Sequence, residues 1–175
     1  MNKLSLGSAL VGVLALTACA TTATAPASSS LSDQDLSFLT SAYQLINFDL
    51  AECAVIQKVG ASASVEQVAQ QVCADAQHYQ PLVAQQAASH GVTLPNTLPY
   101  HLKAELVQLT YNPADINAAY LRSQISSHED SLAIFRDEAA NGVDPSLKQT
   151  AIDTIPVVQA NLDRLRGAMP PGMSY

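Results

Sequence analysis

Three side chains that could bind a metal or take part in redox chemistry lie close together in CADAQH, residues 73–78. Cys73, Asp75 and His78 supply a thiol, a carboxylate and an imidazole, which are common ligands of transition metals. On a helix each position advances about 100° around the axis, so Cys73 and Asp75 point to nearly opposite sides. His78 falls on a face rich in glutamine. The segment therefore predicts no single site, and we expect His78 to be a solvated surface residue.

Two other ionisable residues occur at helical spacing within apolar stripes. Asp49 does so in the first expected helix and His128 in the third. A carboxylate that faces a core needs a partner or a shifted pKa. We expect Asp49 and His128 to form a buried polar contact, directly or through one water, with Asn161 close by. The alternative is an iron or zinc site that adds Asp75, although a metal needs about three or four well-placed ligands.

The sequence contains no recognisable catalytic motif. It has no G-x-S-x-G elbow, no glycine loop of the phosphate-binding type and no C-x-x-C pair. Without the first 18 residues, seven basic and fifteen acidic residues remain, a formal charge of −8 that disfavours nucleic acids and anionic headgroups. The absence of tryptophan leaves little to stack on carbohydrate. These observations indicate a protein that is not an enzyme, carries no cofactor and binds no nucleic acid.

The beginning of the chain is typical of a bacterial lipoprotein leader. Lys3 precedes an apolar stretch that is too short to span a bilayer as a helix. The stretch ends in LTAC, which resembles the lipobox of signal peptidase II substrates. We expect residues 1–18 to be a signal peptide, and Cys19 to become the acylated first residue of the mature chain. Because Ala20 rather than aspartate follows, the outer membrane facing the periplasm is the expected location; an ordinary signal peptide cut nearby is the alternative.

The rest of the chain divides into three parts. Residues 19–31 are small and mostly polar, which is typical of a flexible tether. Residues 32–169 are long enough for one domain with its own core, and residues 170–175 form a tail. No later run of about 18 apolar residues occurs, so the lipid is the only expected contact with the membrane.

Helix start and stop signals predict four long helices in this domain. Ser32 caps the first, which Gly60 ends, and SVEQ, residues 64–67, reads as a capping box that opens the second. The second helix should reach about His90, with a kink at Pro81. A short amphipathic helix around HLKAELVQL comes next.

The two remaining helices begin at proline-containing signals. Asn112 caps the third, which ends near Asn141, and Asp144-Pro145 opens the fourth. With no convincing strand, the pattern predicts an all-α antiparallel four-helix bundle with a short extra helix before the third long helix. An α-solenoid would require an internal repeat, which is not evident. In an up-down-up-down arrangement the first and third long helices would be diagonal and parallel, so Asp49 and His128 would meet across the centre.

The expected hairpin of the first two helices brings two cysteines to similar heights. Cys53 and Cys73 lie about equally far from a turn near Ser62, within about 3 Å of axial rise. In an oxidising compartment such a pair is expected to form a disulfide. Two buried free thiols are the alternative.

Residues 35–168 resemble a family of ferritin-like bacterial envelope proteins, the domain of unknown function numbered 4142. The segments that carry the resemblance are VEQVAQQVCAD, HGVTLP, YLRSQISSHEDSLAIF and LKQTAIDTIPVVQANL. The resemblance implies a ferritin-like bundle, in which inward side chains often build metal sites. Asp49, Asp75 and His128 match polar positions of the family. Ala76 and Asn161 stand where the family has histidines, which argues against a metal-dependent activity here.

These observations favour a non-enzymatic envelope lipoprotein that acts as a binding or structural module, with an envelope protein as a conceivable partner. A ferritin-like metal-binding protein with a degraded core site is the second hypothesis. The third is a protein that binds a small ligand between its helices, which requires an apolar cavity in the bundle.

Overall fold

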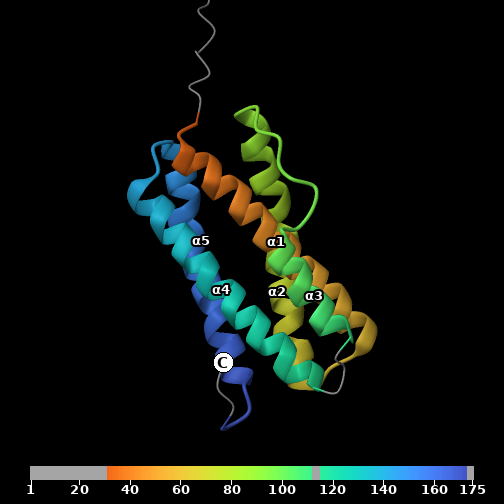
Figure 1. Cartoon of the computed structure of the whole chain (residues 1–175). Coiled ribbons are helices and arrows are strands. Elements are labelled where there is room, and N and C mark those ends of the chain that lie inside the picture. Colours follow the sequence, from red (N-terminus) through yellow and green to blue (C-terminus); the bar gives the residue numbers. More distant parts are fainter. Residues whose placement is uncertain (1–30, 112–114, 173–175) are drawn as a thin grey trace, which may run out of the picture.

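The computed structural model describes residues 31–111 and 115–172, which form five helices and no strand within those ranges. The helices are α1 (Asp33–Val59), α2 (Ala63–Ser89), α3 (Tyr100–Tyr111), α4 (Ile116–Asn141) and α5 (Pro145–Ala168). The four long helices pack as an antiparallel bundle, and α3 lies outside it against α1 and α4 (Figure 1). The predicted all-α bundle with a short extra helix before the third long helix is confirmed.

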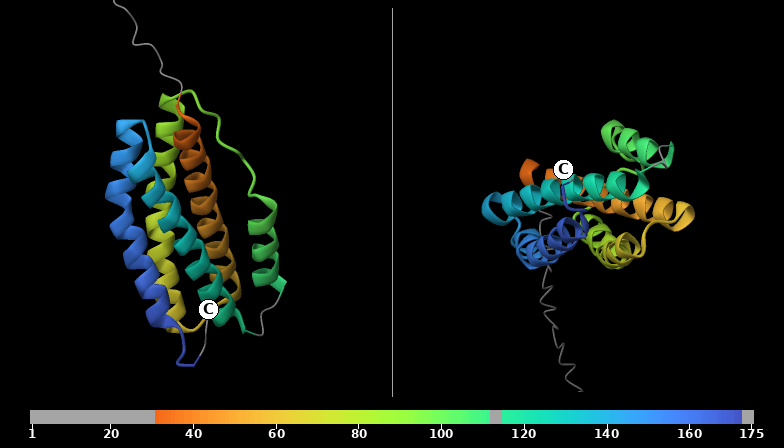
Figure 2. Two further views of the ribbon diagram at one scale, coloured as in Figure 1. Left: turned by 60° about the vertical axis from the view of Figure 1, so that its left-hand side comes forward. Right: turned by 90° about the horizontal axis from the view of Figure 1, so that it is seen from below.

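The order of the helices around the bundle differs from a simple up-down-up-down arrangement. After α2, residues 90–99 and α3 lead the chain back along the bundle, so that α4 starts at the same end as α2 (Figure 2). As a result α1 packs against both α2 and α4, while α5 packs against α4 and α2. The expectation that α1 and α4 are diagonal and parallel is therefore wrong. They are antiparallel neighbours, because the returning connection reverses the direction of α4.

Most helix ends follow the signals in the sequence. Ser32 and Asp35 form a capping box at the start of α1, and Gly60, with a positive φ of 83°, follows its last residue. At the start of α5 the Asp144 side chain accepts hydrogen bonds from the amides of the first turn, and Pro145 occupies the first helical position. α2 continues through Pro81 to Ser89.

Of two further predicted helix starts, one is wrong and the other falls outside the residues that the structure describes. The capping box predicted at Ser64 is wrong, because α2 already begins at Ala63 and Ser62 is its cap residue. Ser62 Oγ contacts the hydroxyl of Ser64 instead of an amide, and the Glu66 carboxylate accepts from the amide of Ala61 in the preceding turn. The cap predicted at Asn112 falls outside the described residues; the Asp115 side chain caps α4.

The Asp35 carboxylate ties the start of α1 to the turn between α4 and α5. It accepts hydrogen bonds from Ser32 and from the backbone amides of Val143 and Asp144, the latter two at 2.8 and 3.1 Å. Burial alone would raise the pKa of Asp35, but these hydrogen bonds outweigh it and lower the pKa to about 2. A charged residue thereby fixes the start of α1 to the α4–α5 turn at the same end of the bundle.

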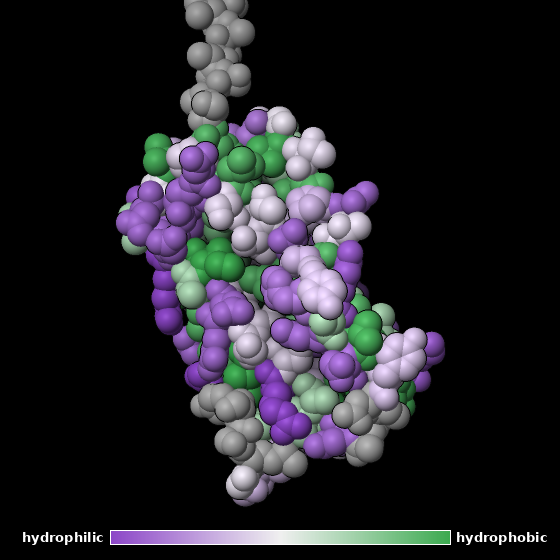
Figure 3. Space-filling view, in the orientation of Figure 1, coloured by the Kyte–Doolittle hydropathy of each residue, from purple (hydrophilic) through white to green (hydrophobic). Residues whose placement is uncertain are grey.

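The disulfide predicted between Cys53 and Cys73 is present and joins the C-terminal part of α1 to α2, with a Cα–Cα distance of 5.9 Å. Around it, apolar side chains fill the bundle, and Phe38 and Phe135 meet edge to face at 5.1 Å. Hydrophilic residues cover much of the face in Figure 3, with apolar residues in small groups between them. Within the described residues, no helix is both long and apolar enough to cross a membrane.

Candidate functional site: a cavity between the four long helices

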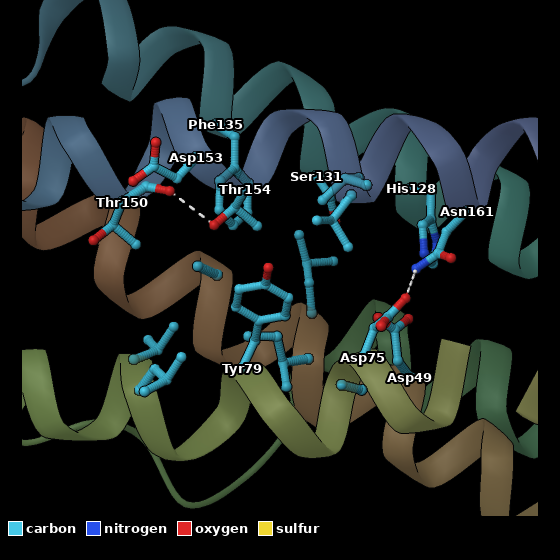
Figure 4. Close-up of a pocket in the computed structure, with 18 of the residues that line it drawn as sticks. Asp49, Asp75, Tyr79, His128, Ser131, Phe135, Thr150, Asp153, Thr154 and Asn161 are labelled. Carbon is cyan, nitrogen blue, oxygen red and sulfur yellow. Dashed lines mark hydrogen bonds between the residues drawn. The ribbon is translucent and has the colours of Figure 1, made fainter. Parts of the chain in front are cut away.

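The four long helices line a pocket of about 490 Å³ that is partly open to solvent. This volume lies within the range of about 300–1,000 Å³ that is usual for small-molecule sites. Its walls include Ile46 of α1, Ala76 and Val83 of α2, and Phe135 of α4. The side chain of Tyr79 points into the space (Figure 4). The interior is thus mainly apolar, as the small-ligand hypothesis requires.

One end of the cavity is polar. Asp49 of α1, Asp75 of α2, His128 of α4 and Asn161 of α5 all line it there, so each long helix supplies one polar side chain (Figure 4). Asn161 Nδ2 donates to Asp75 Oδ2 at 2.9 Å, and Arg164 Nη1 donates to Asn161 Oδ1 at 2.6 Å. The residues singled out in the sequence therefore gather at one place, although α1 and α4 are neighbours rather than diagonal partners.

Asp49 and His128 make no direct hydrogen bond or ion pair. The hydrogen bonds to Asp49 from described residues all reach Oδ1, from Gln124 Nε2 at 3.1 Å and from Ser127 Oγ at 3.5 Å. Burial raises the pKa of the Asp49 carboxyl, against the attraction of His128 and these hydrogen bonds. Its second oxygen, Oδ2, accepts no hydrogen bond from the described part of the chain. These contacts thus offset only part of the free-energy cost of burying a charged Asp49 carboxylate.

His128 is held in one tautomer by its own helix. Its Nδ1 lies 2.9 Å from the backbone carbonyl oxygen of Gln124, one turn earlier. Because a carbonyl oxygen only accepts, Nδ1 carries the proton, and Nε2 is the ring nitrogen that accepts a hydrogen bond when the ring is neutral. The ring therefore lines the cavity with a nitrogen that can receive a hydrogen bond.

Sequence reasoning missed two residues behind this polar end. Glu52 and Gln124 are both fully buried, and Gln124 Nε2 also donates to Glu52 Oε2 at 2.8 Å. Burial raises the pKa of Glu52 to about 8, although hydrogen bonds from Ser123 and Gln124 oppose the change. A signal was present: Glu52 lies three positions after Asp49, and Gln124 four positions before His128, so each shares a helix face with an inward residue.

The opposite end of the cavity is also polar but more open. Thr150, Asp153 and Thr154 of α5 line it, and the Asp153 side chain is exposed (Figure 4). Asp75 and Asp153 both contribute to raising the pKa of the Tyr79 phenol, after the effect of burial. The cavity lining thus contains three carboxylates and one histidine, but neither lysine nor arginine.

The arrangement does not fit a metal centre. Within residues 31–111 and 115–172, no three His, Cys, Asp or Glu side chains are grouped as ligands of one ion. Ala76 lines the cavity without a donor atom, and the Asn161 amide is engaged by Asp75 and Arg164. The segment CADAQH is divided as expected: Cys73 is bonded to α1, Asp75 faces α5, and His78 is exposed.

Comparison with known proteins supports the fold and a family. The family model named domain of unknown function (DUF4142) matches residues 20–167. A solved structure described as a DUF305 fragment from Deinococcus radiodurans is similar, with a TM-score of 0.70 and 15% identity. The alignment covers 79% of this chain and 97% of that chain. At this identity the likeness shows a shared helical fold. No curated protein matches the chain.

Proposed function

Because the chain belongs to the DUF4142 family, whose description names no reaction, we propose that it is a non-enzymatic binding module of the bacterial envelope. In this proposal a small molecule occupies the cavity between the four long helices. A lipid on Cys19 holds the module at the outer membrane, facing the periplasm.

The cavity is the observation that carries the proposal. A bundle whose only task is structural gains stability by filling its interior, since each missing contact costs dispersion energy. Here about 490 Å³ remains between the helices, lined by apolar side chains and by polar groups at both ends, which converge at the end formed by Asp49, Asp75, His128 and Asn161. Such a combination of apolar walls and few oriented polar groups is the usual form of a small-molecule site.

The proposed anchor is supported by the sequence. LTAC ends an apolar stretch too short to span a bilayer, and the family match begins at residue 20, directly after Cys19. These residues precede the described part of the chain, so the support comes from the sequence.

Filling the cavity tests the binding function. Ala76 is buried and lines the cavity, whereas Ala74, two positions earlier on α2, is exposed. We expect the neutral probe 2-phenylethanol to bind the wild-type chain and Ala74→Phe equally well in isothermal titration calorimetry. Ala76→Phe should lower the affinity at least tenfold, because its ring occupies the probe's space.

Ala76→Leu provides a smaller filling change that helix α2 accommodates more easily, with circular dichroism to verify folding. Equal affinity of the probe for Ala74→Phe and Ala76→Phe would contradict the proposal. So would the absence of measurable binding of 2-phenylethanol, 2-phenylethylamine and 3-phenylpropanoate alike to the wild-type chain.

A further inference from the structure

We propose that the ligand of this cavity carries a primary ammonium group on an apolar body, and that the ammonium sits among Asp49, Asp75 and His128. This inference rests on the binding function proposed above. It adds the chemical class of the ligand, which follows from the charges and the hydrogen-bonding atoms that line the cavity.

The charges of the lining favour a cation. Among the described residues, three aspartates and one histidine line the cavity, and no lysine or arginine does. The Arg164 guanidinium donates to Asn161 Oδ1 and is itself exposed. A carboxylate or phosphate ligand would bring a further negative charge beside Asp49 and Asp75 in a partly desolvated space, which is unfavourable.

The hydrogen-bonding atoms at the polar end are acceptors. Asp49 Oδ2 accepts nothing from the described residues, and Nε2 is the nitrogen of the His128 ring that can accept, because Nδ1 donates to a carbonyl. Each Asp75 oxygen accepts one hydrogen bond, Oδ1 from Gln71 and Oδ2 from Asn161, and each can accept another. An ammonium group has three donors and no acceptor, so it complements this set better than a hydroxyl or carboxyl group does.

The burial of Asp49 supports the same choice. Its pKa is raised because burial penalises the charged form, and neither His128 nor the hydrogen bonds from Gln124 and Ser127 compensate fully. A ligand cation near Oδ2 would supply the missing compensation. The aromatic side chains of Tyr79 and Phe135 and the aliphatic walls beside them then receive the apolar body.

Three probes of similar size and different head groups test the ligand class. These are 2-phenylethylamine, 2-phenylethanol and 3-phenylpropanoate, titrated at pH 7 into the purified full-length chain by calorimetry. We expect the amine to bind at least tenfold more tightly than the alcohol, because only the amine brings a cation with three donors. The carboxylate should bind most weakly.

Substitutions locate the head group. Asp49→Asn and Asp75→Asn should each lower amine affinity at least tenfold while changing alcohol affinity less than threefold. Asp130→Asn is the matched control, since Asp130 is exposed on α4 two positions from His128. It should leave amine affinity unchanged. Circular dichroism verifies folding, and Asp75→Asn alone decides the result if Asp49→Asn does not fold.

The outcomes separate the two proposals. If the alcohol or the carboxylate binds as tightly as the amine, the ligand class is wrong and the binding function stands. The same conclusion follows if Asp75→Asn leaves amine affinity unchanged. If none of the three probes binds, both proposals are overturned.

Discussion

Buried carboxyl groups in this molecule differ in pKa because they differ in donors. Asp35 and Glu52 are both almost completely inaccessible. Asp35 accepts from three backbone amides and a hydroxyl, and its pKa falls to about 2. Burial dominates at Glu52, which accepts from two side chains near the charges of Asp49 and Glu105, and its pKa rises to about 8. The hydrogen bonds from the Ser32 hydroxyl and the backbone amides therefore explain the lowered pKa of Asp35, whereas burial explains the raised pKa of Glu52.

Glu52→Gln should weaken the pH dependence of folding stability. A pKa near 8 in the folded chain, against about 4.5 in the unfolded chain, means that stability is greatest below pH 4.5 and falls as pH rises to 8. The slope from one such group is at most about 1.4 kcal/mol per pH unit. Urea denaturation between pH 5 and 8 should show a smaller decline in the variant, with Glu66→Gln on the exposed side of α2 as the control. Parallel declines in both variants and the wild type would contradict the buried state of Glu52.

Asp35→Asn should destabilise the chain with the opposite pH dependence. The folded pKa of Asp35 is depressed, so its contribution is present above its unfolded pKa of about 3.8 and is lost as pH falls toward 2. Replacing a charged acceptor should cost about 1.5–3 kcal/mol at pH 7. Denaturation at pH 7 and pH 2.5 measures the difference, which should shrink at the lower pH. Asp33→Asn, at an exposed position two residues earlier, is the control.

Each hairpin of helices is held by a different local device. A disulfide joins α1 to α2, whereas α4 and α5 are joined by a turn of three residues, 142–144, that Asp35 grips from α1. The cavity lies between the two hairpins. Because the disulfide is confined to the α1–α2 hairpin, it does not fix the distance between that hairpin and α5 across the cavity.

Removing the disulfide should lower stability without abolishing the fold. Closing a loop of 20 residues is worth roughly 3 kcal/mol in the chain-entropy model. The double variant Cys53→Ser/Cys73→Ser should therefore unfold at a lower urea concentration, and its free energy of unfolding should be smaller by about that amount. Thiol titration of unreduced, unfolded wild-type chain should find neither Cys53 nor Cys73 reactive. Two reactive thiols per chain, beyond Cys19, would exclude the bond.

Local signals predicted the elements well, and the long-range arrangement less well. Caps at Ser32 and Asp144 and the glycine after Val59 fixed helix ends, because these depend on a few neighbouring residues. The predicted direction of α4 was wrong because the sequence of a short connecting helix does not indicate which way that helix runs relative to the bundle. Asp49 and His128 were correctly placed inside, since helical periodicity reports burial. Their partners were not found, since those depend on which helices become neighbours.

At the scale of the whole molecule, the proposed anchor makes a prediction about location. Cys19→Ala should release the protein from the membrane fraction or block its processing, because acylation needs the thiol. Cell fractionation and the mass of the mature N-terminus measure this, with Thr22→Ala as a control that should remain membrane-bound. A Cys19→Ala protein that stays in the membrane fraction with unchanged processing would exclude the lipid anchor.

The place where α1 begins has a consequence for how such a tethered molecule would be oriented. Leu31 enters the bundle at the end that carries the α4–α5 turn, while α5 ends at the opposite end (Figure 2). Twelve residues from Cys19 to Leu31 span at most about 40 Å when extended. With the proposed lipid on Cys19, the end of the bundle held by Asp35 would lie within that distance of the membrane surface. The opposite end, with the α1–α2 turn, would be free to move through a wide range of orientations on the periplasmic side, and the cavity between the hairpins would move with it.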